Sequence, residues 1–298
     1  MTHDPSAARA ASGPGGELPP GPSSIPALDA DTSTDAGAGA PGPGSAGDAP
    51  LPTELSGAAR RLFGTRLDLA AAYAGLLATD GVVRGLVGPR EAPRIWDRHL
   101  LNCAAVAELI PDGATVLDVG SGAGLPGLVL AIARPDLSVV LVEPLARRTA
   151  FLDEAVTRLG LRRSVTVVRA RAEEYLAGDP HARPLGDVVT ARAVAPLDRL
   201  AGWCLPLARV GGRLLALKGA SAEDEITEHR DAVERLGGGE PVVRRCGIEV
   251  IDPPTTVVEV VRERAVPPPG GKAARRSARP ARDDGATEAR RKGSRRRR

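Results

Sequence analysis

The sequence is poor in cysteine and has no long apolar run. Its three cysteines, Cys103, Cys204 and Cys246, stand far apart among 298 residues. Their odd number and wide spacing give neither a disulfide framework nor a set of metal ligands, so we expect no metal and predict that each is a small buried apolar residue. No basic-then-apolar leader opens the chain and no apolar run approaches about 18 residues. We therefore expect neither secretion nor membrane contact, and a cytoplasmic location.

Composition divides the chain into three parts. Residues 1–50 carry one Arg against six acids and almost no large apolar side chain that could offset the entropy lost on ordering. Residues 265–298 carry twelve Lys or Arg against three acids. We predict a disordered acidic leader and a disordered basic tail around one folded domain at 51–264. Counterion release attracts such a tail to nucleic acid, so its expected role is nonspecific nucleic-acid contact or that of a solvated extension.

The pattern of apolar residues predicts an α/β domain. Helix-spaced apolar residues at 57–77 and 96–109 indicate an N-terminal helical part within 55–110. From residue 115 onward, β-branched runs alternate with amphipathic stretches, which is typical of crossover units in a parallel sheet. The predicted strands are 115–119, 138–142, 164–168, 186–191 and 212–217, and the predicted helices between them are 125–134, 145–159, 197–209 and 221–236.

The most informative motif is Val-Leu-Asp-Val-Gly-Ser-Gly-Ala-Gly-Leu-Pro-Gly at 116–127. It predicts a buried strand that turns through a glycine loop into a helix, which lets a ligand approach bare backbone. The acid-led spacing that begins at Asp118 resembles the first motif of methyltransferases that use S-adenosylmethionine. The spacing Gly122-x-Gly124-x-x-Gly127 also fits a dinucleotide loop, so the motif alone leaves both cofactors open. A turn that is tight only for packing is a third interpretation.

The end of the domain departs from the alternation of strands and helices. Residues 241–251 and 255–262 are predicted to be two strands joined by Asp252-Pro253-Pro254 with no helix between them. Five parallel strands closed by such an antiparallel hairpin differ from the all-parallel six-stranded dinucleotide fold. They resemble the seven-stranded, Rossmann-like sheet of class I S-adenosylmethionine-dependent methyltransferases. We therefore predict that α/β fold class, with N-terminal helices added.

The candidate cofactor residues follow successive predicted strands, because a ligand of an open α/β sheet lies beyond the carboxyl ends of its strands. Gly120 and Gly122 let the backbone approach the ligand. Glu143 ends the second strand, where a carboxylate can accept both ribose hydroxyls of an adenosine, in a methyltransferase or in an NAD enzyme. Glu173, more than Glu174, is expected to reach adenine after the third strand, although adjacent acids are also common at a helix start.

The segment 187–195, which covers the fourth predicted strand and the residues after it, is where a methyl acceptor would meet the donor. It contains neither an Asn/Asp-Pro-Pro-aromatic loop, which holds an exocyclic amine, nor a Pro-Cys nucleophile for attack on a pyrimidine. Instead it offers Arg192, a permanent cation whose planar fork suits a phosphate or a guanine edge. This residue is therefore a candidate for contact with both cofactor and RNA.

Five short motifs within about residues 98–263 occur together. They are Arg98-His99-Leu100-Leu101-Asn102, residues 118–127, Arg171-Ala172-Glu173-Glu174, Thr190-Ala191-Arg192-Ala193 and Ala216-Leu217-Lys218-Gly219. Together they resemble one family, the ribosomal RNA small subunit methyltransferase G group, also called glucose-inhibited division protein B. The resemblance implies methyl transfer from S-adenosyl-L-methionine to N7 of a guanine in the 530 loop of 16S ribosomal RNA, giving 7-methylguanosine. It also implies cofactor contacts by Gly120, Leu125, Ala172, Glu173 and Arg192, and an RNA contact by Lys218.

The chemistry implied by the resemblance needs no catalytic acid or base. Guanine N7 is neutral and has an available lone pair, so alignment of the reacting atoms can supply a large part of the rate. We accordingly assign no catalytic residue, and we interpret His99 as a packing or RNA-contact residue rather than as a base. The expected partner is 16S ribosomal RNA or the small ribosomal subunit.

Two other functions stay open at the level of sequence. One is a noncatalytic RNA-binding or ribosome assembly factor that keeps a vestigial cofactor fold and binds through its basic tail. The other is an NAD-dependent oxidoreductase with the same glycine loop and Glu143. The absence of a plausible Tyr-x-x-x-Lys hydride site and the predicted closing hairpin disfavour the oxidoreductase.

Overall fold

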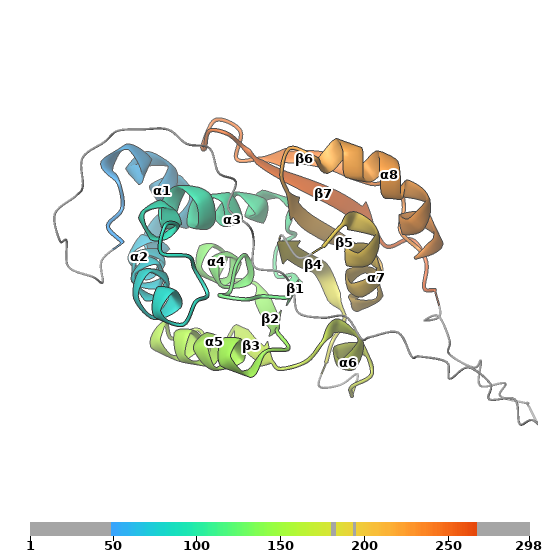
Figure 1. Cartoon of the computed structure of the whole chain (residues 1–298), viewed down its shortest axis with the longest axis horizontal. Helices are drawn as coiled ribbons and strands as arrows, with labels where there is room; N and C mark the ends of the chain where they lie inside the picture. The colour runs from blue at the N-terminus through green and yellow to red at the C-terminus, as the bar shows by residue number, and fades with distance from the viewer. Residues whose placement is uncertain (1–48, 180–182, 193–194, 267–298) are drawn as a thin grey trace, which may run out of the picture. The chain divides into compact units, whose positions relative to one another are not determined.

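The computed structural model describes residues 49–179, 183–192 and 195–266, and a seven-stranded sheet runs through them (Figure 1). Its strands are β1 Thr115–Val119, β2 Ser138–Val142, β3 Val165–Val168, β4 Gly186–Arg192, β5 Ala208–Lys218, β6 Val242–Cys246 and β7 Thr255–Val261. The order across the sheet is β3-β2-β1-β4-β5-β7-β6. Strands β1 to β5 are parallel, and β7 is antiparallel to both β5 and β6. The predicted seven-stranded sheet with a closing antiparallel hairpin is confirmed.

Helices cover both faces of this sheet. The α-helices are α1 Ser56–Phe63, α2 Leu67–Leu76, α3 Asn102–Ala105, α4 Gly127–Ala133, α5 Ala146–Arg158, α6 Ala172–Leu176, α7 Leu197–Cys204 and α8 Ala222–Arg235. Short 3-10 turns occupy Thr53–Leu55, Gly64–Arg66, Ala92–Arg94, Val106–Leu109 and Leu205–Leu207, and π-helical segments occupy Leu77–Gly81 and Ile95–Leu101. The N-terminal helical part is thus confirmed as a series of short segments, in which Gly64 (φ 53°) separates α1 from α2.

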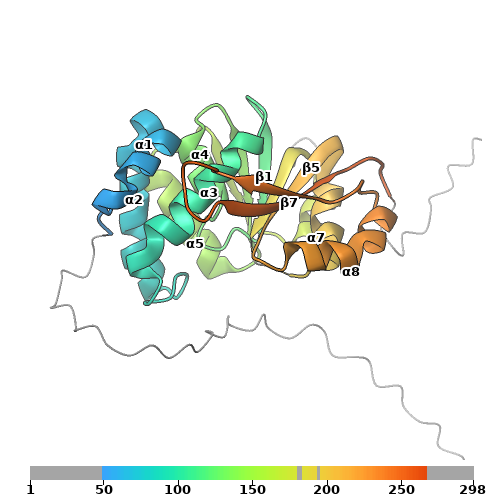
Figure 2. The ribbon, with the colours of Figure 1, turned by 90° about the horizontal axis from the view of Figure 1, so that it is seen from above.

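Two cores form because successive strand residues point to opposite faces of the sheet. Val116 of β1 packs in a core with residues of α1 to α5, whereas its neighbour Leu117 packs in a second core with residues of α6 to α8. The two groups of helices are separated by the sheet in Figures 1 and 2. The cysteines are free and buried within these cores, as predicted. The N-terminal helical part therefore shares a core with one face of the whole sheet.

Some predicted boundaries are wrong for identifiable reasons. The predicted helix 197–209 ends early, because β5 begins at Ala208 and continues through Gly211-Gly212. Those glycines pair with the residue after β7, since Arg262 accepts from the Gly211 amide and donates to the Gly212 carbonyl. The first hairpin strand ends at Cys246 rather than at 251, because Gly247 and Glu249 adopt positive φ values of 75° and 67°. Helix α6 was not among the predicted crossover helices.

The predicted acidic leader and basic tail lie almost entirely outside the described residues. Of the leader 1–50, only residues 49 and 50 are described, and of the tail 265–298 only residues 265 and 266. The boundaries at 51 and 264 therefore stay predictions. Within the described ranges, no helix combines the length and the apolar character needed to cross a membrane.

Candidate functional site

The loop between β1 and α4 turns on glycines in the left-handed region of φ. Gly120, Gly122 and Gly124 have φ values of 70°, 57° and 97°, which residues with a Cβ rarely adopt. A Cβ added at Gly122 would meet only the Gly120 carbonyl oxygen, at 3.8 Å, so the backbone there faces open space. A Cβ at Gly124 would lie 2.9 Å from the Tyr73 hydroxyl oxygen. Gly122 is thus open to a ligand, whereas Gly124 is required for close packing.

Asp118, the acid that leads the motif, holds the loop in place through buried hydrogen bonds. Its carboxylate is only 1% exposed, with Oδ2 accepting from the Gly127 amide at 3.1 Å and Oδ1 from the Thr190 hydroxyl at 3.0 Å. Burial raises the pKa of Asp118 to about 6, although these hydrogen bonds act in the opposite direction. The side chain ties β1 to β4 and to the start of α4, and its role is structural.

Glu143 holds its carboxylate directly beside the open glycine. It directly follows β2 and is 1% exposed, with Oε2 accepting from the Gly122 amide at 2.9 Å and Oε1 from the Leu145 amide at 3.0 Å. The nearest Arg148 nitrogen is 3.8 Å from Oε2. Each carboxylate oxygen can accept a second hydrogen bond. The geometry fits the ribose-binding role predicted for Glu143, because the fixed acceptor lies next to backbone that a ligand can approach.

The two acids after β3 have different surroundings. Glu174 accepts a hydrogen bond from the Arg171 amide at 2.9 Å, so it caps the start of α6. Glu173 is exposed, and Ala172, the first residue of α6, is 8% exposed. Glu174 therefore has the capping role that sequence offered as an alternative to cofactor contact. Glu173 and Ala172 lie after the strand adjacent to β2, where the predicted adenine contact would require them.

Arg192 ends β4 and is held by residues of the N-terminal helical part. Its Nη2 lies 2.9 Å from Nδ1 of His99, and its Nη1 lies 3.6 Å from Sγ of Cys103. Tyr73 of α2, which is fully buried, donates its hydroxyl to the Ala123 carbonyl at 2.6 Å. Strands β2, β1 and β4 are neighbours in the sheet, so their carboxyl ends bring Glu143, the glycine loop and Arg192 to one edge. The N-terminal helices thus contact both the loop and the end of β4.

The side chains of the N-terminal helical part that lie near Arg192, which are His99, Cys103 and Tyr73, are neutral near pH 7. Burial and the Arg192 charge lower the pKa of His99 to about 4, although Glu91 acts in the opposite direction. Burial raises the pKa of the Cys103 thiol and raises the pKa of the Tyr73 phenol well above its usual value. Neither the thiol nor the phenol supplies an anion at this place. The permanent charge of the arrangement is the Arg192 guanidinium.

Lys218 does not face solvent. Its side chain is 8% exposed, and Nζ donates to Oε2 of Glu225 at 2.6 Å and to the Ala195 carbonyl at 2.8 Å. Glu225 also accepts from the Leu197 amide, at the start of α7, at 3.1 Å. The lysine therefore organises the connection from β4 to α7. The RNA contact predicted for Lys218 stays a prediction, and it requires this ion pair to open.

Sequence analysis missed the roles of three residues at this edge, Tyr73, Cys103 and Glu91, and the contact between His99 and Arg192. Tyr73 and Cys103 occupy apolar helical positions, which predict burial and nothing more. Glu91 precedes the Arg-His pair and binds both of its side chains, with Oε1 accepting from Arg98 and Oε2 contacting His99. The short separation in sequence between Glu91 and the Arg98-His99 pair was the signal that could have predicted this contact. The contact between His99 and Arg192 spans 93 positions and leaves no local pattern.

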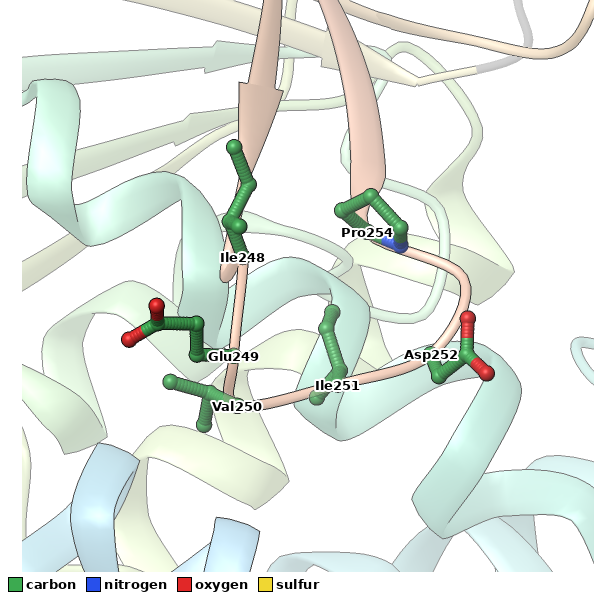
Figure 3. Close-up of a pocket in the computed structure, with 6 residues that line it drawn as sticks. All are labelled: Ile248, Glu249, Val250, Ile251, Asp252 and Pro254. Carbon is green, nitrogen blue, oxygen red and sulfur yellow. The ribbon is translucent and has the colours of Figure 1, made fainter.

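A pocket of the structure lies on the connection between β6 and β7 (Figure 3). Its lining residues all come from this one connection: Ile248, Glu249, Val250, Ile251, Asp252 and Pro254. The connection is held against the N-terminal helical part, because the Gly247 amide donates to Glu108 and Arg61 donates to the Glu249 carbonyl. None of the predicted site residues lines this pocket.

Known proteins resemble this chain over most of the described domain. The chain matches the family model described as rRNA small subunit methyltransferase G over residues 66–249. It is 73% identical to a protein named Ribosomal RNA small subunit methyltransferase G from Salinispora tropica, over 73% of this chain and 90% of that protein. It is 60% identical to a protein of the same name from Thermobifida fusca, over 69% of this chain and 84% of that protein. The family match includes every site residue predicted from the sequence.

Proposed function

The chain belongs to the ribosomal RNA small subunit methyltransferase G family, and from this premise we propose that its methyl acceptor is N7 of a guanine in the 530 loop of 16S ribosomal RNA. The protein is an enzyme with the class I methyltransferase fold, its cofactor is S-adenosyl-L-methionine and its substrate is ribosomal RNA. This membership does not favour an NAD-dependent oxidoreductase or a noncatalytic assembly factor. The cofactor supplies a methyl group on a positively charged sulfur.

The glycine loop and Glu143 support the cofactor site. Gly122 leaves its backbone open, and the adjacent Glu143 carboxylate is already fixed by two backbone amides. Preformed acceptors of this kind bind hydroxyl groups at little cost in ordering. We assign Gly120, Gly122 and Glu143 to the ribose side of the cofactor. The further cofactor contacts that we propose are Leu125, Ala172, Glu173 and Arg192.

The observation that carries the choice of acceptor is the guanidinium at the end of β4, whose hydrogen-bond partners His99 and Cys103 are neutral. Attack by guanine N7 needs no prior proton removal, and burial keeps the Cys103 thiol protonated, which makes it a poor nucleophile. Arg192 can donate to guanine O6 or to a phosphate through its planar fork. What the protein supplies is alignment of the acceptor with the bound methyl group, which can account for a large part of the rate.

The proposed partner is 16S ribosomal RNA, free or within the small ribosomal subunit. Arg192 is the proposed RNA contact at the reacting base, and Lys218 is a second one if its pairing with Glu225 opens. The basic segment at 265–298 adds nonspecific attraction to nucleic acid in this proposal. A ribosomal RNA substrate supports the cytoplasm as the location of the enzyme.

Transfer of tritium-labelled methyl to small ribosomal subunits tests this function. The subunits come from cells that lack the modification, and the labelled base is located by borohydride reduction and aniline cleavage, which cuts RNA at 7-methylguanosine. We expect cleavage at one guanine of the 530 loop. Subunits that already carry the modification serve as the control and should accept no label. Label on a ribose or an exocyclic amine would contradict the N7 assignment, and unlabelled RNA would contradict ribosomal RNA as the substrate.

A further inference from the structure

We propose that His99 is a positioning residue, which receives a hydrogen bond from Arg192 and thereby fixes the guanidinium at the end of β4. The inference rests on the proposed function, because that proposal places Arg192 against the cofactor and the guanine. It assigns His99 neither the packing role nor the RNA contact expected from its place beside Arg98. The side chain acts through Arg192 and not on the reacting atoms.

Only one position of the ring proton of His99 is compatible with the hydrogen bond from Arg192. A guanidinium only donates hydrogen bonds, so the 2.9 Å approach of Arg192 Nη2 requires a lone pair on His99 Nδ1. The proton of the neutral ring is then on Nε2, which lies 3.1 Å from Oε2 of Glu91 and can donate to it. The three side chains form a directed chain from Arg192 through His99 to Glu91. A carboxylate behind the ring fixes its tautomer and its orientation.

The charged groups around His99 preserve this tautomer. Glu91 faces Nε2, and its other oxygen accepts from Arg98 at 2.8 Å, so its charge is shared between the two side chains. Arg192 faces Nδ1 from β4. Burial, Arg192 and Arg98 lower the pKa of His99 to about 4 against the opposing effect of Glu91. Near pH 7 the ring is therefore neutral and its Nδ1 lone pair is available.

The backbone that carries His99 is fixed by the core. The ring belongs to the π-helical segment Ile95–Leu101, in which Ile95, Trp96, Leu100 and Leu101 are buried. Irregular π turns inside helices frequently occur at functional sites, because they move a side chain out of the regular helical positions. Cys103 provides a second contact to Arg192, through sulfur at 3.6 Å. Sulfur is a weak acceptor, so the imidazole is the main restraint on this guanidinium.

Two conservative variants separate a positioning role from a packing role. In His99→Asn the amide oxygen takes the place of Nδ1, so the acceptor for Arg192 is kept and the donor to Glu91 is lost. In His99→Gln the amide nitrogen can take the place of Nε2, so the donor to Glu91 is kept and the acceptor for Arg192 is lost. We expect His99→Gln to lower kcat about tenfold or more, because misplacing a reacting group by about 1 Å can cost up to 100-fold. His99→Asn should keep kcat within about threefold of the unsubstituted enzyme.

The control measurements are the melting temperature of each variant and its affinity for S-adenosylmethionine by calorimetry. Equal values of kcat for the two variants, whether high or low, or the reverse order, would overturn the proposal.

A third measurement needs no substituted histidine. Long-range proton–nitrogen spectra of the His99 ring should show Nδ1 unprotonated, with a resonance that moves in Arg192→Lys. An Nδ1 that carries the proton, or a resonance that ignores Arg192→Lys, would also overturn it.

These measurements keep the two proposals apart. The ring spectra report the contact between His99 and Arg192 without any methyl transfer. If the unsubstituted enzyme methylates another atom of the RNA, the proposed function fails, whereas the order of the Asn and Gln variants still decides the role of His99. If the RNA accepts no label at all, the spectra alone decide it.

Discussion

The loop after β1 takes its shape from backbone and one carboxylate, whereas the end of β4 is held by side chains from the N-terminal helical part. We call Gly120, Gly122 and Glu143 the donor half of the site, because they form the proposed cofactor contact. Arg192 forms the acceptor half of the site together with its two partners, His99 and Cys103. In the donor half, the Gly122 amide donates to Glu143 across 21 positions. In the acceptor half, Arg192 contacts His99 and Cys103 across 93 and 89 positions.

Because of this difference, we expect that binding of S-adenosylmethionine and methyl transfer from it can be changed separately. Backbone amides and positive φ values shape the donor half, so a small change there should remove cofactor affinity. Side-chain contacts hold the acceptor half, so changes to the residues that position Arg192, such as His99, should lower the rate while the cofactor still binds. Variants in the two halves are therefore expected to differ in which quantity they change as well as in the size of the change.

The largest effect is expected from Gly122→Leu. A side chain at this position would project into the open space beside Glu143, where we place the ribose. We expect the affinity for S-adenosylmethionine to fall at least about 100-fold, which corresponds to about 2.7 kcal/mol. Calorimetric titration of the cofactor measures the loss. Methyl transfer should fall with it.

Gly160→Leu is the matched control for that variant. Gly160 has a similar φ of 66°, is exposed, and would place its Cβ in open space after α5. Both substitutions carry the backbone strain of a left-handed residue, about 1–2 kcal/mol of unfolding free energy. Only Gly122→Leu should weaken cofactor binding. Equal affinity in the two variants would remove Gly122 from the cofactor site.

A smaller effect on the same half is expected from Glu143→Gln. The amide keeps one acceptor, but its NH2 group then faces one of the backbone amides of Gly122 and Leu145 that the carboxylate now accepts. We expect cofactor affinity to fall about tenfold, or about 1.4 kcal/mol. Glu154→Gln, on the exposed surface of α5, should leave the affinity unchanged. Unchanged affinity in Glu143→Gln would assign the ribose hydroxyls to other residues.

The acceptor half should show itself in the pH dependence of stability. The pKa of His99 falls from 6.5 to about 4 on folding, so between these values the unfolded chain binds more protons and the free energy of unfolding decreases as the pH is lowered. The pKa of Asp118 rises from 3.8 to about 6, so its contribution increases as the pH is lowered through that window. His99→Gln removes the first contribution and leaves the second. On going from about pH 7 to about pH 5, the variant should lose roughly 2 kcal/mol less than the parent.

Urea denaturation at the two pH values measures this difference. The comparison uses the change with pH within each protein, so a loss of packing that is independent of pH cancels. If the free energies of unfolding of parent and variant changed in parallel, His99 would not be held neutral by its surroundings, and the acceptor half would lack the electrostatic support described above.

The two halves also differ in how far the sequence predicted them. The strands β1 and β2 and the residues of the donor half follow from local patterns, because a glycine loop after an apolar strand needs no distant partner to be recognised. Arg192 was identified from its position after the fourth strand, but its partners were not, since the contact with His99 exists only when the N-terminal helices pack against β4. The RNA contact of Lys218 was implied by the family resemblance and stays a prediction, whereas its ion pair with Glu225 could not be recognised from the sequence.

The smallest effect on the site is expected from deletion of residues 267–298, which belong to neither half. This segment holds all twelve basic residues of the predicted tail and lies outside the described residues. Each phosphate contact that the deletion removes should lower the slope of log affinity for RNA against log salt by about 0.7–0.9. Cofactor affinity should not change, and kcat at saturating RNA should stay within about twofold, because no residue of either half is removed. An equal-length tail with its Lys and Arg replaced by Gln is the control and should behave like the deletion. If the deletion instead abolished cofactor binding, the domain would extend beyond 264, and the donor half would depend on residues that neither half contains.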